Sequence, residues 1–467
     1  MTTDQAPREG RGGARRLLFS RPVLLVAFAF AVMADPVSSV VYAIEAALRA
    51  LHGDLALLLP TMAVVVGLVA LVISNYHQLV ARFPQGGGAA AAAGVAFGEG
   101  WAFIPIGALI VDFVLTIAIS VSAASSAVIA YVPALAGLRI PLALGALLAV
   151  AALTWLGHLG RAVFAAMTLT FVVVAALVLV SGVHATPQAV HASAPAGPGG
   201  SAAFLAVLMA FPVAMALATG VEAPSSAIAQ LAQLDDAGRR RFGRVTLWLT
   251  LGVVGTLTLG LAATSVRLGI GIPHHDSTQI ADVARVSAGP RVFALFQLLT
   301  ALLLLAAASS SFQAGPGLLK ALARRPQADG QTTGIMAARL GVTNRHHTPY
   351  WAVLVFVVVS AAVVVAAGGR DQELVLFYAV SVFMSFLVGL VAMAKFERSE
   401  RRYAAMAISV LGAVLVGFTL AVNLARGDPI ASLVAALLIA LLLHRLWAAA
   451  GRPRGIAQAI VTAEAGE

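Results

Sequence analysis

Three carboxylates stand deep inside apolar segments of this 467-residue sequence, and they are the first residues that suggest chemistry. They are Asp35, Asp112 and Glu222, and we expect no Lys, Arg or His at the same depth. An ionised acid in apolar surroundings costs at least a few kcal/mol unless it is compensated. Each acid must therefore be protonated, hydrogen-bonded by free backbone amides or neutralised by a bound cation. All three solutions suit a pathway for cations or protons.

Hydroxyl groups follow one of these acids at helical spacing. Asp112, Thr116 and Ser120 are spaced i, i+4 and i+8, so a helix places all three on one face. Hard cations such as Na⁺ and K⁺ prefer oxygen ligands of this kind. The spacing predicts a monovalent-cation site here, and we expect no other metal site. The alternative for any one hydroxyl is a bond to the carbonyl one turn earlier.

The other two acids open nearly the same pentapeptide. Residues 35–39 read Asp-Pro-Val-Ser-Ser, and residues 222–226 read Glu-Ala-Pro-Ser-Ser. Proline lacks the amide donor and clashes with the preceding turn, so we expect both helices to break there. Asp35 before Pro36 fits a helix N-cap followed by proline at the first helical position. The alternative is that the prolines and serines only kink two helices.

Two more hydroxyls lie near these breaks. Thr219 precedes Glu222 by three residues, and Tyr42 lies two turns beyond Asp35, close enough to reach back toward the same pocket. Glu45 lies about 15 Å beyond Asp35 at the helical rise per residue, so we expect it at the membrane interface.

The composition shows what surrounds these residues. Hydrophobic residues make up 60% of the chain and charged residues only 11%, against roughly a quarter in soluble proteins. The mean hydropathy is +0.94. These values exclude a soluble enzyme, a nucleic-acid binder and a disordered chain, and the absence of Cys excludes disulfides and thiolate sites. The sequence predicts a polytopic membrane protein with the lipid bilayer as its surroundings and no nucleic-acid partner.

A bilayer core of about 30 Å needs about 20 apolar residues per helix. We predict 12 membrane spans, all helical, near residues 22–50, 56–74, 102–132, 138–157, 162–183, 202–231, 245–266, 290–319, 350–367, 372–394, 404–423 and 428–448.

Basic residues test this count. With the N-terminus inside, 23 of the 30 Lys and Arg residues fall on inner segments and 7 on outer ones. This asymmetry favours a protein of the cell membrane with both termini on the cytoplasmic side. We divide the chain into a basic tail (1–21), a ten-span core (22–395), two further spans (396–450) and a second tail (451–467). The core splits into halves near 22–183 and 202–395, and we expect an outer loop at 184–201.

The two pentapeptides lie five spans apart, in the first and sixth spans. Five spans between copies give the second copy the opposite orientation in the membrane. Paired interruptions in corresponding spans of two halves indicate a transporter binding site near the midplane.

The motifs resemble those of the amino acid–polyamine–organocation (APC) superfamily. The resemblance rests on residues 35–45, on Arg-Phe-Pro-Gln-Gly-Gly-Gly at 82–88, on residues 111–123 and on Thr-Gly-Val-Glu at 219–222. It implies an all-α membrane fold with about 12 helices. A LeuT-type core of ten helices forms an inverted 5+5 repeat with helices 1 and 6 broken, and two C-terminal helices follow.

Within the superfamily, the sequence is most similar to the KUP-type bacterial potassium importers. Residues 310–312 and 377–386 resemble their spans 8 and 10, although span 8 otherwise diverges. The resemblance implies an ion path, with Asp35 and Glu222 as candidates to exchange the coupling proton. The path is lined by Asp35, Tyr42, Asp112, Thr116, Ser120, Thr219, Glu222 and Tyr378.

The expected function is secondary active transport of a small cation, with K⁺ favoured, by proton-coupled symport and alternating access. No cofactor is expected beyond the transported or coupling ions H⁺, K⁺ or Na⁺, and the sequence leaves a homodimer open. An amino acid permease is the main alternative, because Asp35 could be protonated or could bind a substrate amine. A cation channel is a weaker alternative, and an enzyme is not expected because no nucleotide-binding or hydrolase motif is present.

Overall fold

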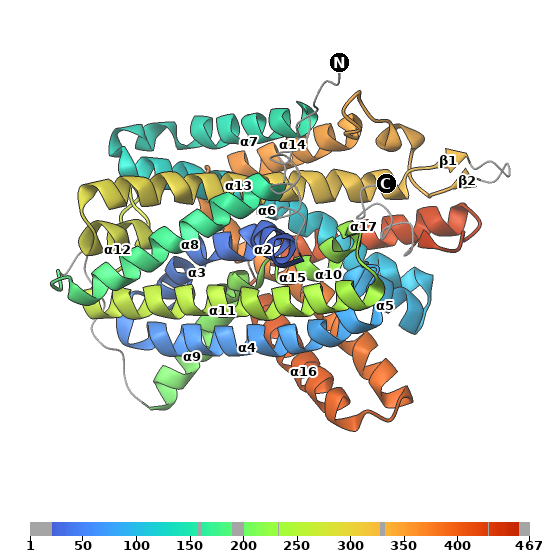
Figure 1. Ribbon diagram of the computed structural model, residues 1–467, viewed down its shortest axis with the longest axis horizontal. Coiled ribbons are helices and arrows are strands. Elements are labelled where there is room, and N and C mark those ends of the chain that lie inside the picture. Colours follow the sequence, from blue (N-terminus) through green and yellow to red (C-terminus); the bar gives the residue numbers. More distant parts are fainter. Residues whose placement is uncertain are drawn as a thin grey trace, which may run out of the picture.

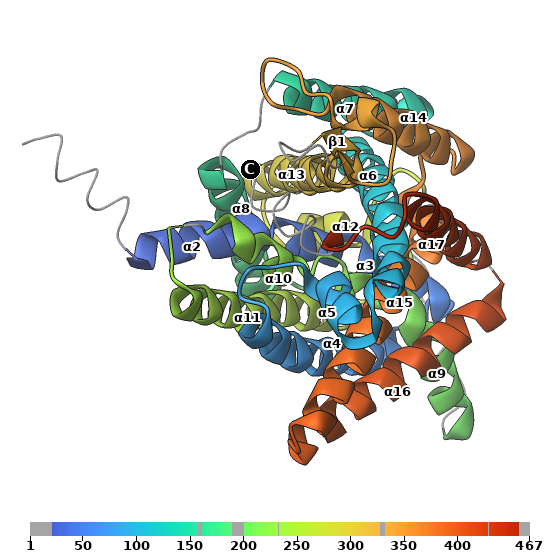
Figure 2. The ribbon, with the colours of Figure 1, turned by 90° about the vertical axis from the view of Figure 1, so that its right-hand side faces the viewer.

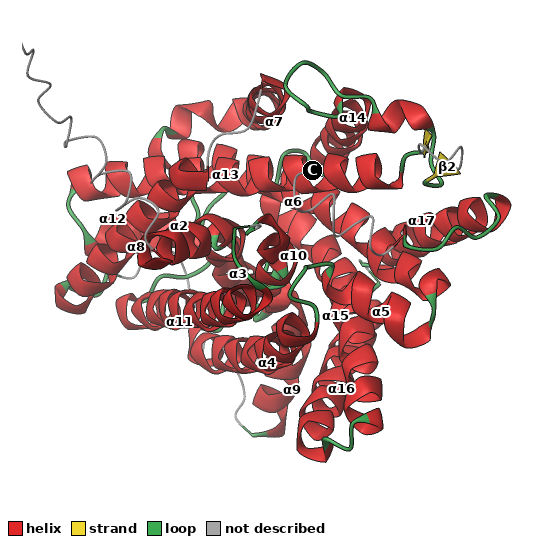
Figure 3. Ribbon diagram, turned by 45° about the vertical axis from the view of Figure 1, so that its right-hand side comes forward, coloured by secondary structure: helices red, strands yellow, loops and turns green. Residues whose placement is uncertain are grey.

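The computed structural model describes residues 21–156, 161–188, 200–231, 233–326, 332–427 and 429–456. Within these ranges the chain is almost entirely helical (Figure 3). The predicted N-terminal tail and most of the predicted outer loop and C-terminal tail lie outside the described residues.

All twelve predicted spans are present as helices. Eleven of them, within the described ranges, are long and apolar enough to cross a membrane. The remaining one, α14, has 17 residues. In chain order the spans are α2 with α3 (Arg21–Val32, Ala34–Ala50), α4 (Leu55–Arg82), α6 (Phe103–Tyr131), α7 (Arg139–Leu156), α8 (Arg161–His184), α9 with α10 (Ser201–Ala214, Ala223–Ala227), α11 (Asp236–Leu268), α13 (Pro290–Leu322), α14 (Tyr350–Ala366), α15 (Asp371–Ser399), α16 (Tyr403–Arg426) and α17 (Ile430–Ala449).

The packing of these helices follows the expected two halves. α4 packs on α11, α6 on α13, α7 on α14 and α3 on α9, so each of these spans contacts the span five places later. A two-fold axis in the membrane plane relates such partners and brings them together at the axis. Figure 1 shows α4, α11 and α13 running along the long axis of the molecule, with α3 and α6 enclosed among them. The arrangement supports the predicted inverted repeat.

The first span bends one turn before its proline. α2 ends at Val32 and α3 begins at Ala34, with Met33 between them. The Met33 amide still donates to the Ala29 carbonyl and the Val37 amide to the Met33 carbonyl, both at 2.9 Å, so the span is kinked rather than unwound. The proline ring at position 36 clashes with the carbonyl four residues earlier, at Val32.

The prediction that Asp35 is an N-cap was wrong in position. Met33 is the N-cap of α3, and Asp35 is the second helical residue, inside the first turn. Its side chain therefore does not cap the amides at the start of α3 and can face the neighbouring span.

The sixth span is interrupted more strongly. α9 ends at Ala214, a 3-10 turn covers Met215–Ala218, and non-helical backbone follows until α10 begins at Ala223. Gly220 lies in this stretch with a φ of +70°, a conformation that only glycine adopts without strain. The interruption therefore depends on glycine as well as on Pro224, which lies in the first turn of α10.

The two ends of the bundle carry different short elements. One end carries α12 (Gln279–Ser287), and the other carries α5 (Gly88–Phe97) and a small hairpin of β1 (Arg325–Pro326) and β2 (Thr332–Thr333). They lie at opposite ends of the long axis in Figure 1. The hairpin within the long loop after α13 was not predicted.

The α5 end packs directly against the second half of span 6. Figure 2 looks onto this end and shows α5 and α10 near its middle. Gly88, the first residue of α5, has a φ of +48°, and a Cβ there would lie 3.3 Å from the Ser225 hydroxyl and 3.4 Å from that of Ser226. The glycine run at 86–88 therefore forms the tight, packed turn that its composition predicts.

Candidate functional site

The two interruptions face each other across the repeat axis. A Cβ on Gly220 would lie 2.8 Å from the carboxyl carbon and one oxygen of Asp35, so the side chain from span 1 rests on the turn of span 6. Glu222 follows two residues later, and its charge and that of Asp35 act on each other. The acids of the two pentapeptides therefore belong to one site.

The third acid completes this site from α6. Asp112 is only 4% exposed, and its charge acts on both Asp35 and Glu222. Its carboxyl group lies within hydrogen-bonding reach of the Tyr378 hydroxyl on α15. The hydroxyl oxygens of Thr116 and Tyr378 lie 2.9 Å apart, and both side chains are buried. Tyr378 thus links two members of the Asp112 face.

The predicted hydroxyls divide into two groups. Thr219 donates to the Ala216 carbonyl at 2.6 Å, which is the local back-bond alternative. Tyr42 donates to Ser39 at 3.1 Å and also lies within reach of Thr219. Ser120, by contrast, is 1% exposed and has no hydrogen-bond partner. Ser120 therefore keeps its hydroxyl available on the Asp112 face, whereas Thr116 shares a hydrogen bond with Tyr378.

Several polar atoms of the site have no hydrogen-bond partner, and those named below are all oxygens that can accept a hydrogen bond or bind a cation. In the described part of the chain, the buried site atoms without a hydrogen-bond partner include Asp35 Oδ1, Asp112 Oδ1, Glu222 Oε2, Ser120 Oγ and Ser122 Oγ. Buried polar groups in proteins are almost always paired, so such a cluster needs an explanation. No described basic side chain acts on any of the three acids. A proton or a small cation would supply the missing partner.

The α12 end of the site is closed by a set of polar contacts. Glu45 was expected at the interface, but it is 3% exposed and accepts hydrogen bonds from Arg49 at 2.9 Å and from the Gln279 amide of α12 at 3.0 Å. Arg139 donates to Ser126 at 2.6 Å, and Ser126 donates to Asp371 at 2.7 Å. These contacts tie α3, α6, α12 and α15 together on the α12 side of Asp35.

The side chains of the site differ in how deeply they are buried. Asp112, Thr116 and Ser120 are each less than 5% exposed, whereas Asp35 and Glu222 are half-buried. The two half-buried acids lie on the interrupted spans, and the fully enclosed face lies on the continuous helix α6. The arrangement provides an enclosed oxygen-lined position beside two acids that retain some access.

One residue of the site was missed from the sequence. Tyr76 on α4 is 1% exposed, and its hydroxyl has no hydrogen-bond partner. Glu222 exerts the largest charge effect on it, and Ser385 lies beside it. A tyrosine within an apolar span and away from the ends is the signal that could have indicated it, since buried tyrosines normally pair their hydroxyl.

Two other clusters of polar residues lie outside this site. His274, His275 and Asp276 are exposed in the loop before α12, and no group of three metal-ligating side chains occurs among the described residues. Glu99 starts the 3-10 turn that leads into α6, and its carboxylate accepts from the Gly455 and Ile456 amides.

Comparison with known proteins gives three results. The family model described as amino acid permease matches residues 24–443. The potassium transporter KimA of Bacillus subtilis (strain 168) is 31% identical over 340 residues, which cover 71% of this chain and 53% of KimA. The match therefore spans about half the length of that relative. The manganese transporter of Eremococcus coleocola, solved with an aromatic bis-isothiourea substituted compound, shares 16% identity with a TM-score of 0.48 and covers 96% of this chain and 97% of that one.

Proposed function

Because this chain belongs to the amino acid permease family of the APC superfamily, and is therefore a multi-pass membrane transporter and not an enzyme, we propose that its substrate is a small monovalent cation. K⁺ is the favoured ion, and a proton travels with it in the same direction. Na⁺ is the other candidate for the coupling ion.

The observation that carries the proposal is the meeting of three acids without a basic partner. Asp35, Asp112 and Glu222 come from three different spans, and each keeps at least one buried oxygen that no described residue satisfies. Burying an unpaired charge is expensive, and more so when like charges surround it. A site of this kind favours positive ligands.

In the proposed mechanism, the cation is held by the Asp112 face. Asp112, Thr116 and Ser120 supply oxygen atoms, Tyr378 orients the first two, and Tyr42 closes the pocket from span 1. Asp35 and Glu222 exchange the proton. The pocket can close around its contents only when protonation and cation binding have neutralised the acids, which makes the two events depend on each other.

Two further features favour a cation over an amino acid. An ionised Asp35 beside the turn of span 6 would repel a substrate carboxylate. The interruption itself reads Met-Ala-Leu-Ala-Thr-Gly at 215–220, without an aromatic side chain that could cover a larger ligand. The name of KimA, a potassium transporter, agrees with this preference.

An amino acid remains the second candidate because the matched family model is described by that substrate class. In that case Asp35 would either be protonated, so that it no longer repels the substrate carboxylate, or be ionised and bind the substrate amine. The eight site residues would be the same, but their roles would change.

Uptake into proteoliposomes that contain only this protein tests the proposal. Rb⁺, a potassium analogue, is compared with a panel of labelled amino acids under an inward proton gradient. We expect saturable Rb⁺ uptake that collapses when the gradient is dissipated. Amino acid uptake without Rb⁺ flux would overturn the cation assignment, and Rb⁺ flux that neither saturates nor responds to protons would indicate a channel.

The proposal includes a location and an orientation. We place the chain in the cell membrane with the α5 end and both termini on the cytoplasmic side, as the distribution of basic residues favours. No partner beyond the bilayer and the transported solute is required, and a homodimer is compatible with the fold.

A further inference from the structure

Glu397 is a fourth acid with unsatisfied oxygens among the described residues, and it lies far from the three acids of the central site. It lies near the α5 end of α15, its side chain is 0% exposed, and neither carboxylate oxygen has a hydrogen-bond partner among the described residues. It follows Tyr378 by 19 positions, which corresponds to about 28 Å along a helix. The transport mechanism proposed above makes no use of it.

Ser409 from the neighbouring helix α16 lies beside this acid, and Asn75 from α4 binds Ser409. Asn75 of α4 donates its side-chain amide to the Ser409 hydroxyl of α16 at 2.9 Å, and both residues are at most 1% exposed. Ser409 lies beside Glu397. The side-chain oxygen of Asn75 is also without a partner. The helices α4, α15 and α16 thus meet at a cluster with three unpaired acceptor oxygens. The donors that remain are the Ser409 hydroxyl and the second N–H of the Asn75 amide.

We propose that Glu397, Asn75 and Ser409 form a proton-binding site that is separate from the transport site. With one proton on Glu397, the acid hydroxyl donates to the Asn75 side-chain oxygen. Asn75 donates to Ser409, as observed, and Ser409 donates to the second oxygen of Glu397. This closed ring gives every oxygen of the cluster a partner, whereas an ionised Glu397 would face the Asn75 oxygen with no proton between them.

The charged groups nearby do not replace the proton. Arg82 of α4 and Arg402 in the turn after α15 favour an ionised Glu397, and Glu400 opposes it. Arg82 forms an ion pair with Glu400, and Arg402 lies 3.8 Å from the same carboxylate. Both guanidinium groups are therefore engaged with Glu400 at the surface.

The remaining helices contribute no charge at this position. α5, which packs on α15, has no charged residue, and the only one in α16, Arg426, lies at its far end. The ionisation of Glu397 is thus governed by its own hydrogen bonds and by the surface charges just named.

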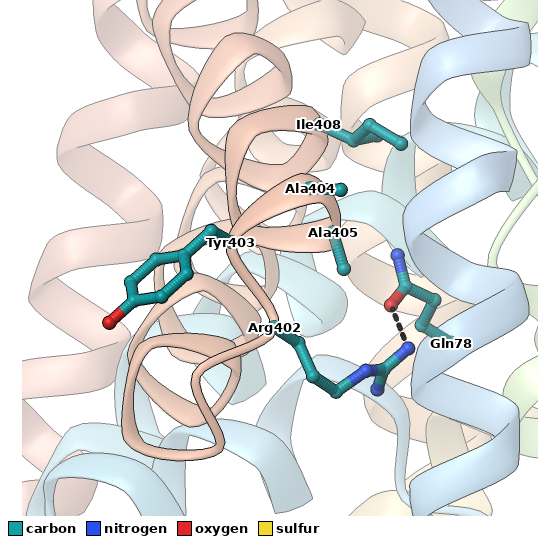
Figure 4. Close-up of a pocket in the computed structure, with 6 residues that line it drawn as sticks. All are labelled: Gln78, Arg402, Tyr403, Ala404, Ala405 and Ile408. Carbon is teal, nitrogen blue, oxygen red and sulfur yellow. Dashed lines mark hydrogen bonds between the residues drawn. The ribbon is translucent and has the colours of Figure 1, made fainter.

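A groove beside the cluster gives the proton a route to water. It encloses about 420 Å³ between α4 and α16 and is lined by Gln78, Arg402, Tyr403, Ala404, Ala405 and Ile408 (Figure 4). Arg402 spans it with a 3.2 Å hydrogen bond to Gln78, and its backbone amide donates to the Glu397 carbonyl at 2.8 Å. Ile408 precedes Ser409 directly. The groove therefore ends one residue or one helical turn from each member of the cluster.

Deprotonation would loosen the contact among α4, α15 and α16. The site would therefore make the packing of these helices depend on the pH at the α5 end, whatever the transported substrate is. This pH dependence does not involve the central acids, because no residue of the transport site belongs to the Glu397 cluster.

Infrared spectroscopy and thermal unfolding of the purified full-length protein test this site. Spectra are recorded between about pH 6 and about pH 9. The carboxylic acid C=O band of a buried acid should lose intensity as the pH rises, and Glu397→Gln should lack that component. The glutamine amide can donate as the acid does, so the variant should keep its apparent Tm better at high pH. We expect the wild type to lose about 2–4 °C more than the variant over this range.

Two further variants distinguish an effect of the Glu397 cluster from the effect of removing any acid of α15. Glu373→Gln changes an exposed acid at the other end of α15 and should behave as the wild type. Asn75→Leu removes the acceptor of the acid proton and should move the midpoint of the infrared band to lower pH. An unchanged band in Glu397→Gln, or a Glu397→Gln protein less stable than wild type at pH 6, would overturn the proposal.

Discussion

Replacement of Asp112 by asparagine separates the role of this residue in binding from its role in folding. The variant keeps an oxygen that can accept from Tyr378, but it removes the negative charge. An ionised carboxylate with 4% exposure and no basic partner costs several kcal/mol of desolvation. An asparagine whose amide stays unpaired costs about 1–3 kcal/mol. The first term is larger, so we expect the empty variant to be as stable as the wild type or more stable.

Cation binding should show the opposite effect. If K⁺ binds only the folded wild type, a concentration one hundred times the Kd stabilises it by about 2.7 kcal/mol, or about 3–5 °C in apparent Tm for a chain of this size. The Asp112→Asn variant should lose this shift and all Rb⁺ uptake while it still reaches the membrane.

Thermal unfolding in KCl is compared with unfolding in choline chloride at equal ionic strength, and uptake is measured on the same preparations. Normal uptake by the variant, or a K⁺-dependent shift equal to that of the wild type, would refute the assignment of Asp112 as the cation ligand. A variant that is unstable without any cation would show instead that the charge is needed for folding.

Three further predictions test the rest of the site. Wild-type uptake should fall as the external pH rises, and Glu222→Gln should flatten this dependence; if the pH profile is unchanged, the proton is carried by another group. Thr116→Val and Tyr378→Phe should not be additive in the KM for Rb⁺, because one 2.9 Å hydrogen bond joins them; a coupling of about 0.5–1.5 kcal/mol, or about 2- to 13-fold, is expected from a double-mutant cycle, and strict additivity would exclude the contact. Gly220→Ala should lower uptake, and in the thermal assay it should lower the free energy of unfolding by at least about 1–2 kcal/mol. The substitution adds strain at a φ of +70° and a Cβ 2.8 Å from the Asp35 carboxyl group. Uptake and stability equal to those of the wild type would contradict this close approach.

Much of this architecture follows from local physical signals in the sequence. Apolar runs long enough for a bilayer mark the spans, and proline beside an acid marks both interruptions. The kink in span 1 falls at Met33 because a proline acts on the carbonyl four residues before it and not on its own position. The N-cap prediction for Asp35 was wrong because it placed the start of the helix at the proline itself, whereas α3 begins at Ala34 with Met33 as its N-cap.

The contacts between halves could not be read from one sequence. Nothing local indicates that Asp35 packs on Gly220, because the two residues are 185 positions apart and meet only through the repeat axis. The same holds for Glu45, which lies at the end of its span but becomes buried when α12 folds over it. Tyr76 and Glu397 were missed for a related reason, since their unpaired atoms appear only when α4, α15 and their neighbours are assembled.

The number of acids limits how such a site can couple two ions. If one K⁺ and one proton bind among the three carboxylates, they neutralise two of them, and the third must remain protonated throughout or stay where water still reaches it. Asp112 is enclosed, whereas Asp35 and Glu222 are half-buried, so the two acids with access are the ones that can change protonation as the site opens to either side. If both were fully protonated in the empty carrier, cation entry would release protons and the ions would be exchanged. Symport requires instead that at least one of these acids is ionised, without proton or cation, when the empty carrier reorients. That carboxylate must then be stabilised by the protein, and the turn of span 6 that packs on Asp35 is the element that can do so.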